Sequence, residues 1–187
     1  MDNFSYLSVL VSIVLGLGIT NLLSGVATLV RSRACLRIYW PMPVWITTLF
    51  LIHIQTWWSM FGLREVGTWS FAVFLIVLLQ PVALFLMAAV ISPKVLNTGV
   101  TDLRSQWFSE SRWLFGTLAG ALFISLAKNF VVNGRLPELP DLVAHAVFVA
   151  VALAGAVSRS DMVHKILAPL GVVLYGGYIA LLFTTLS

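Results

Sequence analysis

Charged residues are scarce in this chain of 187 residues. Asp, Glu, Lys and Arg make up 10% of the sequence, whereas an average soluble domain contains roughly 25%. Hydrophobic residues make up 60%, and the mean hydropathy is +1.00. So few charges cannot cover a globule in water with polar surface. The composition therefore argues against a soluble domain and favours an integral membrane protein.

Cysteine is nearly absent as well, because Cys35 is the only one. A single cysteine excludes an internal disulfide and a thiolate metal cluster within one chain. The sequence also lacks the HExxH, Walker, GxGxxG and GxSxG motifs, and its 7 acidic residues fall at the N-terminus or between apolar runs. We therefore expect no enzyme activity, no cofactor and no metal site.

Six long apolar runs occupy most of the sequence, and about 20 apolar residues suffice to cross the hydrocarbon core of a bilayer as a helix. The runs are continuous rather than alternating, which favours helices over strands. We predict an all-α polytopic membrane protein, a bundle of about six transmembrane helices forming a single domain over residues 1–187. The expected helices cover residues 5–29, 42–63, 69–92, 113–132, 142–158 and 162–186.

The longest polar stretch in the sequence is residues 93–112, between the third and fourth apolar runs. It mixes charged residues with Trp107 and Phe108, which is typical of a short amphipathic helix lying at a membrane interface. An ordinary solvated loop has the same composition. The sequence leaves both alternatives open.

Lys and Arg are unequally divided between the two sides of the predicted bundle. Because short cytoplasmic loops retain positive charge, the richer side is expected to be cytoplasmic and both termini outside. Anionic lipid headgroups are the expected partners of that basic side, and the net charge of +4 does not indicate nucleic-acid binding. The richer side holds Arg31, Arg33, Arg37, Lys94, Arg104, Arg112, Arg159 and Lys165, and the other side Arg64, Lys128 and Arg135.

Small residues recur every fourth position along the first apolar run. Such a stripe allows another helix to approach closely, which matters because helices in lipid associate through van der Waals contact and interhelical hydrogen bonds. The partner can be a helix of the same chain, a second copy or another membrane protein. The predicted packing face consists of Ser8, Ser12, Gly16, Thr20 and Ser24.

Polar residues inside apolar runs are candidates for a functional site because they are costly to bury in lipid. Counting 1.5 Å of rise per residue places His53 and Gln80 near the membrane midplane, with Gln55 and Asn21 close by. At this depth His53 and Gln80 can hydrogen-bond each other. These four residues can line a polar pocket, or they can simply hydrogen-bond one another between helices.

A second polar group is expected nearer the outer face, where Lys128, Asn129 and His145 fall at similar depths. These side chains can face an anion or handle protons. Alternatively, Lys128 extends to the headgroups and only its aliphatic stem lies in lipid.

Tryptophan is frequent near the predicted helix boundaries, at Trp40, Trp45, Trp69, Trp107 and Trp113. At a boundary the indole ring meets lipid and its N–H meets water. We therefore predict an aromatic belt at the membrane surface for these residues.

Two functions are compatible with these patterns. The first is a non-catalytic membrane subunit that assembles with itself or within a larger complex. The second is a small channel or carrier with a polar site around His53, Gln55 and Gln80. A short six-helix chain with the segment His-x-Gln-x-Trp-Trp at residues 53–58 is similar to bacterial membrane proteins, which implies a bacterial inner membrane as the location.

Overall fold

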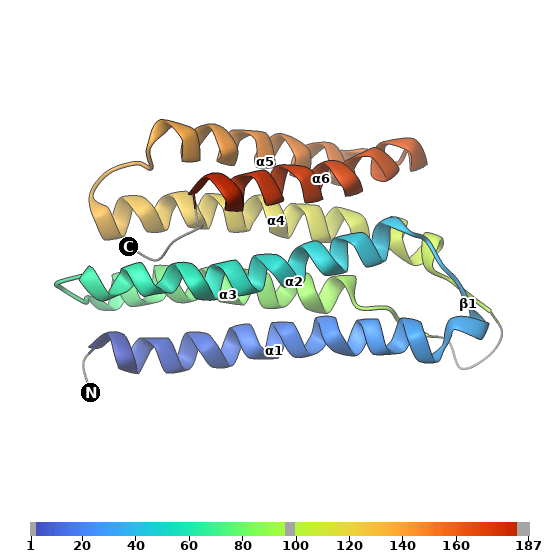
Figure 1. Ribbon diagram of the computed structural model, residues 1–187, viewed down its shortest axis with the longest axis horizontal. Coiled ribbons are helices and arrows are strands. Elements are labelled where there is room, and N and C mark those ends of the chain that lie inside the picture. The colour runs from blue at the N-terminus through green and yellow to red at the C-terminus, as the bar shows by residue number, and fades with distance from the viewer. Residues whose placement is uncertain (1–2, 96–99, 183–187) are drawn as a thin grey trace.

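The structure is a computed structural model that describes residues 3–95 and 100–182. Over these residues the chain forms six α-helices that lie lengthwise beside one another in a bundle (Figure 1). This confirms the predicted helical bundle. The helices are α1 (Asn3–Arg31), α2 (Pro41–Ser59), α3 (Phe71–Ile91), α4 (Leu103–Asn133), α5 (Leu139–Val157) and α6 (Asp161–Leu182), with short 3-10 turns η1 (Arg33–Cys35) and η2 (Met60–Glu65).

Five of these helices, α1, α3, α4, α5 and α6, are long and apolar enough to cross a membrane. The sixth, α2, has 19 residues and includes polar side chains such as His53 and Gln55. It packs against α1, α3 and α6. Among these polar residues, His53 is buried and Gln55 is partly buried.

The bundle has two distinct ends because consecutive helices run in opposite directions (Figure 1). We call one the basic end: it contains the α1–α2, α3–α4 and α5–α6 connections. We call the other the terminal end: α1 begins there, α6 ends there, and the α2–α3 and α4–α5 connections lie there. Between the ends, α3 packs on α1 and α4, while α4 packs on α5 and α2 packs on α6.

Local sequence signals set several helix ends. Pro41 occupies the first turn of α2, where a missing N–H costs no helical hydrogen bond. The Ser70 hydroxyl accepts a hydrogen bond from the Val73 N–H at 3.2 Å and caps α3. Gly134 ends α4 with φ of 66°, a left-handed conformation that glycine adopts without strain.

Helix α4 begins at Leu103, ten residues earlier than the predicted start at 113. The described part of the polar stretch is therefore neither a separate interfacial helix nor wholly a loop. Leu103 and Trp107 are buried, at 0% and 2% exposure. They continue the apolar face of α4 into the polar stretch, which explains why the helix extends through it.

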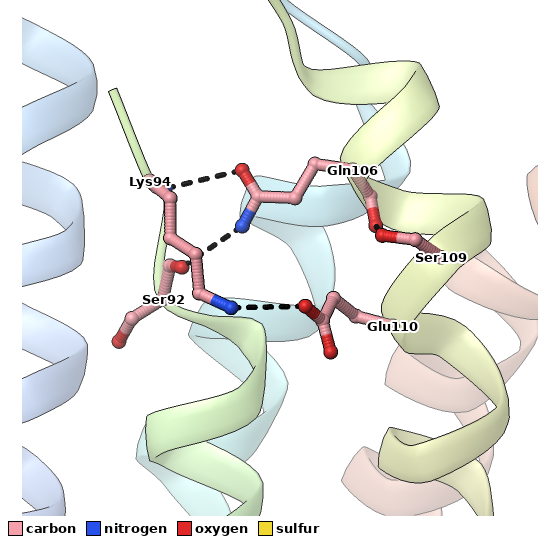
Figure 2. Close-up of polar contacts among 5 residues, drawn as sticks. All are labelled: Ser92, Lys94, Gln106, Ser109 and Glu110. Carbon is pink, nitrogen blue, oxygen red and sulfur yellow. Dashed lines mark hydrogen bonds and ion pairs between the residues drawn. The ribbon is translucent and has the colours of Figure 1, made fainter. Parts of the chain in front are cut away.

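Polar side chains fasten the end of α3 to this first part of α4 (Figure 2). The Gln106 side chain accepts from the Lys94 backbone N–H and donates to the Ser92 carbonyl oxygen, both at 3.1 Å. The Lys94 ammonium lies 2.9 Å from a Glu110 carboxylate oxygen. The two Gln106 contacts satisfy backbone groups left over where α3 ends.

A two-residue parallel ladder also lies at the basic end, between β1 (Leu36–Arg37) and β2 (Thr101–Asp102). The sequence predicted no strand. The pairing holds the α1–α2 and α3–α4 connections beside each other, and it leaves the helical class of the bundle unchanged.

The buried face of α1 differs from its small-residue stripe. Leu7, Val11, Leu15 and Leu22 are each 1% exposed and point into the bundle. The stripe is partly buried at Ser8, Ser12 and Gly16 and exposed at Thr20 and Ser24. A Cβ added at Gly16 would meet nothing within 4 Å. Packing within the chain therefore rests on the leucine face, and the predicted packing face lies at the side of it.

The predicted aromatic belt is wrong for two of its members. Trp45 and Trp107 are 3% and 2% exposed. Each contacts the Phe115 ring edge-on, with centroid separations of 5.1 and 6.1 Å. Proximity to a helix boundary did not reveal which side of the helix the indole occupies. Trp40 and Trp113, by contrast, are 44% and 68% exposed.

Candidate functional site

The polar residues of the terminal half come together between α3 and α4. The Lys128 ammonium donates a hydrogen bond to the Gln80 side-chain oxygen at 2.7 Å. Gln80 lies nine residues from the start of α3, or about 14 Å into the bundle at 1.5 Å per residue. Lys128 lies five residues before the end of α4. The lysine is therefore directed inward to an acceptor near the middle of α3 rather than outward to the surface.

Helix α5 adds a carboxylate and an imidazole. His145 Nδ1 lies 3.2 Å from Asp141 Oδ1 and 2.8 Å from the Asp141 carbonyl oxygen. Both partners are acceptors, so Nδ1 is the nitrogen that bears the hydrogen. His145 Nε2 lies 3.2 Å from the Ser125 hydroxyl of α4, which can donate to it. The imidazole makes all these contacts without needing a positive charge.

Two tyrosines of α6 complete the site. The Tyr178 hydroxyl donates to Asp141 Oδ1 at 2.9 Å, and the Tyr175 hydroxyl donates to the Gln55 side-chain oxygen of α2 at 3.2 Å. Side chains from five helices are thus joined around one space. Tyrosine can bury its ring in the bundle while its hydroxyl finds such a partner.

Apart from Tyr175, these groups line a polar cavity of about 290 Å³. A second cavity of about 280 Å³ shares Asn129, Asn133 and Asp141 with it and reaches the α4–α5 connection. The polar space therefore extends to the surface at the terminal end. By the volume of liquid water, about 30 Å³ per molecule, the inner part alone has space for several waters or one small solute.

The innermost part of this space is apolar. A chamber of about 100 Å³ shares Gln55, Gln80 and His145 with the polar cavity. Its deeper wall is apolar and includes Trp45, Leu84, Met87 and Val151.

Aromatic packing fills the bundle beyond the chamber. Phe115 lies between Trp45 and Trp107, and its centroid is 5.7 Å from that of the fully buried His164. Gly155 permits this layer because a Cβ there would lie 2.6 Å from the Phe115 ring. We call this group the aromatic layer: Trp45, Trp107, Phe115 and His164.

The two predicted polar groups are partly merged. Gln55 and Gln80 of the predicted midplane site line the same cavity as Lys128, Asn129 and His145 of the predicted outer site.

His53 and Asn21, in contrast, lie elsewhere. His53 is fully buried, its Nδ1 donates to the Leu49 carbonyl oxygen at 2.7 Å, and its ring packs against Gly18. The predicted contact between His53 and Gln80 is not formed. Asn21 accepts a hydrogen bond from Ser92 through its backbone oxygen at 3.4 Å.

Sequence reasoning missed Asp141, Ser125, Tyr175 and Tyr178. Asp141 follows Pro140 and precedes the predicted helix at 142–158, yet it lies in the first turn of α5. The available signal was its spacing of four residues from His145, which places both on one helix face. The tyrosines gave no comparable signal, because tyrosine is also common at membrane boundaries.

No group of three or more His, Cys, Asp and Glu side chains that could hold a metal occurs in the described part of the chain. Comparisons with protein-family models, with curated proteins and with solved structures found no match.

Proposed function

We propose that the protein crosses a membrane with all six helices and binds a small polar solute in the cavity at its terminal end. The observation that carries this proposal is the 290 Å³ cavity into which Lys128, Gln80, Asp141 and His145 converge. Ionisable groups inside a membrane bundle are costly, and they characteristically mark solute or ion pathways. The even number of helices places both ends of the described chain on one side.

The geometry favours a binding protein or carrier over an open channel. Polar cavities continue from the α4–α5 connection to the midplane, whereas the aromatic layer fills the bundle toward the basic end. This arrangement favours entry of a solute from the terminal end. If the protein is a carrier, the aromatic layer must rearrange for the solute to leave on the other side.

We further propose that the terminal end faces outward and the basic end faces the cytoplasm of a bacterial cell. The support is the excess of Lys and Arg at the basic end. Arg31, Arg33 and Arg37 are exposed there. They are suited to anionic lipid headgroups.

Cysteine labelling tests both the cavity and its orientation. In a Cys35→Ser background, Asn129→Cys should react with a membrane-impermeant thiol reagent added outside intact cells. Ser111→Cys is a matched control on the same helix, because Ser111 is buried at 3% exposure and should stay unreactive. Native Cys35, which is exposed at the basic end, should react only after permeabilisation. Failure of Asn129→Cys to react in any condition would contradict a hydrated cavity.

A second function, assembly with another copy or a partner, is favoured by the position of the small-residue stripe on α1. The chain does not use this stripe for its main internal packing, and the space beside Gly16 is open. Gly16→Leu should dissociate an assembly without unfolding the subunit. Gly116→Leu on α4 is the control, since its added Cβ also meets nothing within 4 Å. A single-chain mass for the wild type in mild detergent would remove this proposal.

A further inference from the structure

The charges of the polar cavity are opposite in sign and are not paired with each other. Lys128 and Asp141 both line the cavity and influence one another electrostatically. Yet among the described residues, no direct ion pair of 4 Å or less joins them. The cavity thus presents one cationic and one anionic group to a common space. A buried site of this kind favours a ligand that carries both charges, because each ligand charge then replaces lost hydration with an opposite charge.

The hydrogen-bonding groups around Lys128 are donors, which matches its positive charge. The Lys128 ammonium has three donors and uses one on Gln80. Gln80 accepts through its side-chain oxygen, and within the described part of the chain its amide N–H groups have no acceptor, so they can donate to a ligand. These donors suit a carboxylate.

Asp141 provides the complementary acceptor. The contacts from Tyr178 and His145 both fall on Oδ1. Among residues 3–95 and 100–182 no contact falls on Oδ2, which can accept from an ammonium group. The contacts from Tyr178 and His145 hold the Asp141 carboxylate in place, so its geometry is set before a ligand arrives.

The apolar chamber limits what the rest of the ligand can be. It holds about 100 Å³, and a cavity of about 150 Å³ accommodates the six carbons of benzene. In proportion, about four carbons fit. An aliphatic group of this size would contact Trp45, Leu84, Met87 and Val151.

From these features we infer that the cavity binds a zwitterionic amino acid with a small aliphatic side chain. Its carboxylate lies at Lys128 and Gln80, its ammonium at Asp141, and its side chain in the apolar chamber. This inference rests on the proposed function, since it names the class of solute that the same cavity takes.

The test compares three ligands of one shape with the wild-type protein in lipid nanodiscs. L-leucine has both charges, 4-methylpentanoate lacks the ammonium, and 3-methylbutylamine lacks the carboxylate. We expect L-leucine to bind at least tenfold more tightly than either analogue, because a site that hydrogen-bonds a polar group discriminates against a ligand lacking it. Equal affinity for L-leucine and 4-methylpentanoate would overturn the inference that the ligand is a zwitterion, but the cavity would still be a binding site.

A variant tests the chamber separately. Ala121 lines the chamber and is 7% exposed, so Ala121→Leu should occupy most of its volume. Binding of L-leucine should fall at least tenfold, while glycine should bind the variant no more than about threefold more weakly than the wild type. Unchanged L-leucine binding would overturn the chamber assignment, and retained glycine binding shows that the variant is folded.

Complete absence of binding would also overturn the inference. The labelling experiment then shows whether only the amino-acid inference fails or the proposed function fails as well. If none of these ligands binds although Asn129→Cys reacts from outside, the amino-acid inference fails and the hydrated cavity stands. If Asn129→Cys also fails to react, the proposed function fails with it.

Discussion

Polar residues occur at both ends of the bundle, but they are arranged differently. At the basic end, Lys94 pairs with Glu110, and their side chains are 67% and 29% exposed. At the terminal end, His145 pairs with Asp141, and their side chains are 7% and 21% exposed. The first pair fastens two helices at the surface, whereas the second lines an internal space. Burial, rather than the presence of an ion pair, distinguishes a structural contact from a candidate site.

The largest expected effect of a single substitution is at the cavity carboxylate of Asp141, which is partly buried. Asp141→Ala removes the acceptor of both Tyr178 and His145 and leaves Lys128 without its nearby negative charge. We expect a loss of about 3 kcal/mol in the free energy of unfolding, measured by denaturation in a mild detergent. Glu138→Ala is the control, because Glu138 is an exposed acid directly before α5, and it should cost about 0.5 kcal/mol or less. Equal losses would remove the distinction between the acid of the cavity and an acid of the surface.

The second largest effect is expected at the aromatic layer, which lies between the cavity and the basic end. Gly155→Val should destabilise the fold by about 2 kcal/mol, because its Cβ would lie 2.6 Å from the Phe115 ring. Thermal unfolding in detergent would measure the change. Gly120→Val is a matched control on α4, since its Cβ would meet nothing within 4 Å. A Gly155→Val variant as stable as this control would show that the aromatic layer is loosely packed.

His53 provides a buried polar residue that lies outside the cavity. Gly18→Ala should cost about 1–2 kcal/mol, because the new Cβ would overlap the His53 ring. Gly16→Ala, only two residues away, should be neutral or slightly stabilising, since alanine favours a helix more than glycine. Comparison of the two melting temperatures measures the difference. Similar values would mean that α1 does not approach α2 closely at His53.

The smallest effect is expected at the surface clamp of the basic end. Glu110→Gln should lower the free energy of unfolding by about 0.5 kcal/mol. The loss should shrink in high salt, because exposed charges are screened. Unfolding at low and high ionic strength would measure both. A salt-independent loss above about 2 kcal/mol would show that this pair is as sheltered as the one at the terminal end.

The sequence predicted the helical bundle because apolar runs of this length have few alternatives in lipid. It placed the start of α4 too late because hydropathy alone treats Arg104 and Glu110 as interruptions. Leu103 and Trp107 lie on the buried face of the same helix. A helix with one polar and one buried face gives a low average hydropathy over its polar part, so the average misses its first turns.

The candidate site was predictable in its members more than in its arrangement. Gln80, Lys128 and His145 were recognisable as polar residues within apolar runs. The grouping of His53 with Gln55 failed because the two residues are two positions apart on α2. At 3.6 residues per turn, such positions are separated by about 200° around the helix axis and point to nearly opposite sides. Only Gln55 therefore faces the cavity. The approach of Lys128 to Gln80 depends on how α3 and α4 are rotated against each other, which no single helix sequence specifies.

The most direct test of the cavity is a high-resolution cryo-EM map of the protein in lipid nanodiscs. We predict ordered water or solute density between Lys128, Gln80 and Asp141, with Trp45 and Phe115 in continuous contact beyond the chamber. A map in which Lys128 pairs directly with Asp141, and α4 closes against α5 with no density between them, would contradict a solute-binding cavity.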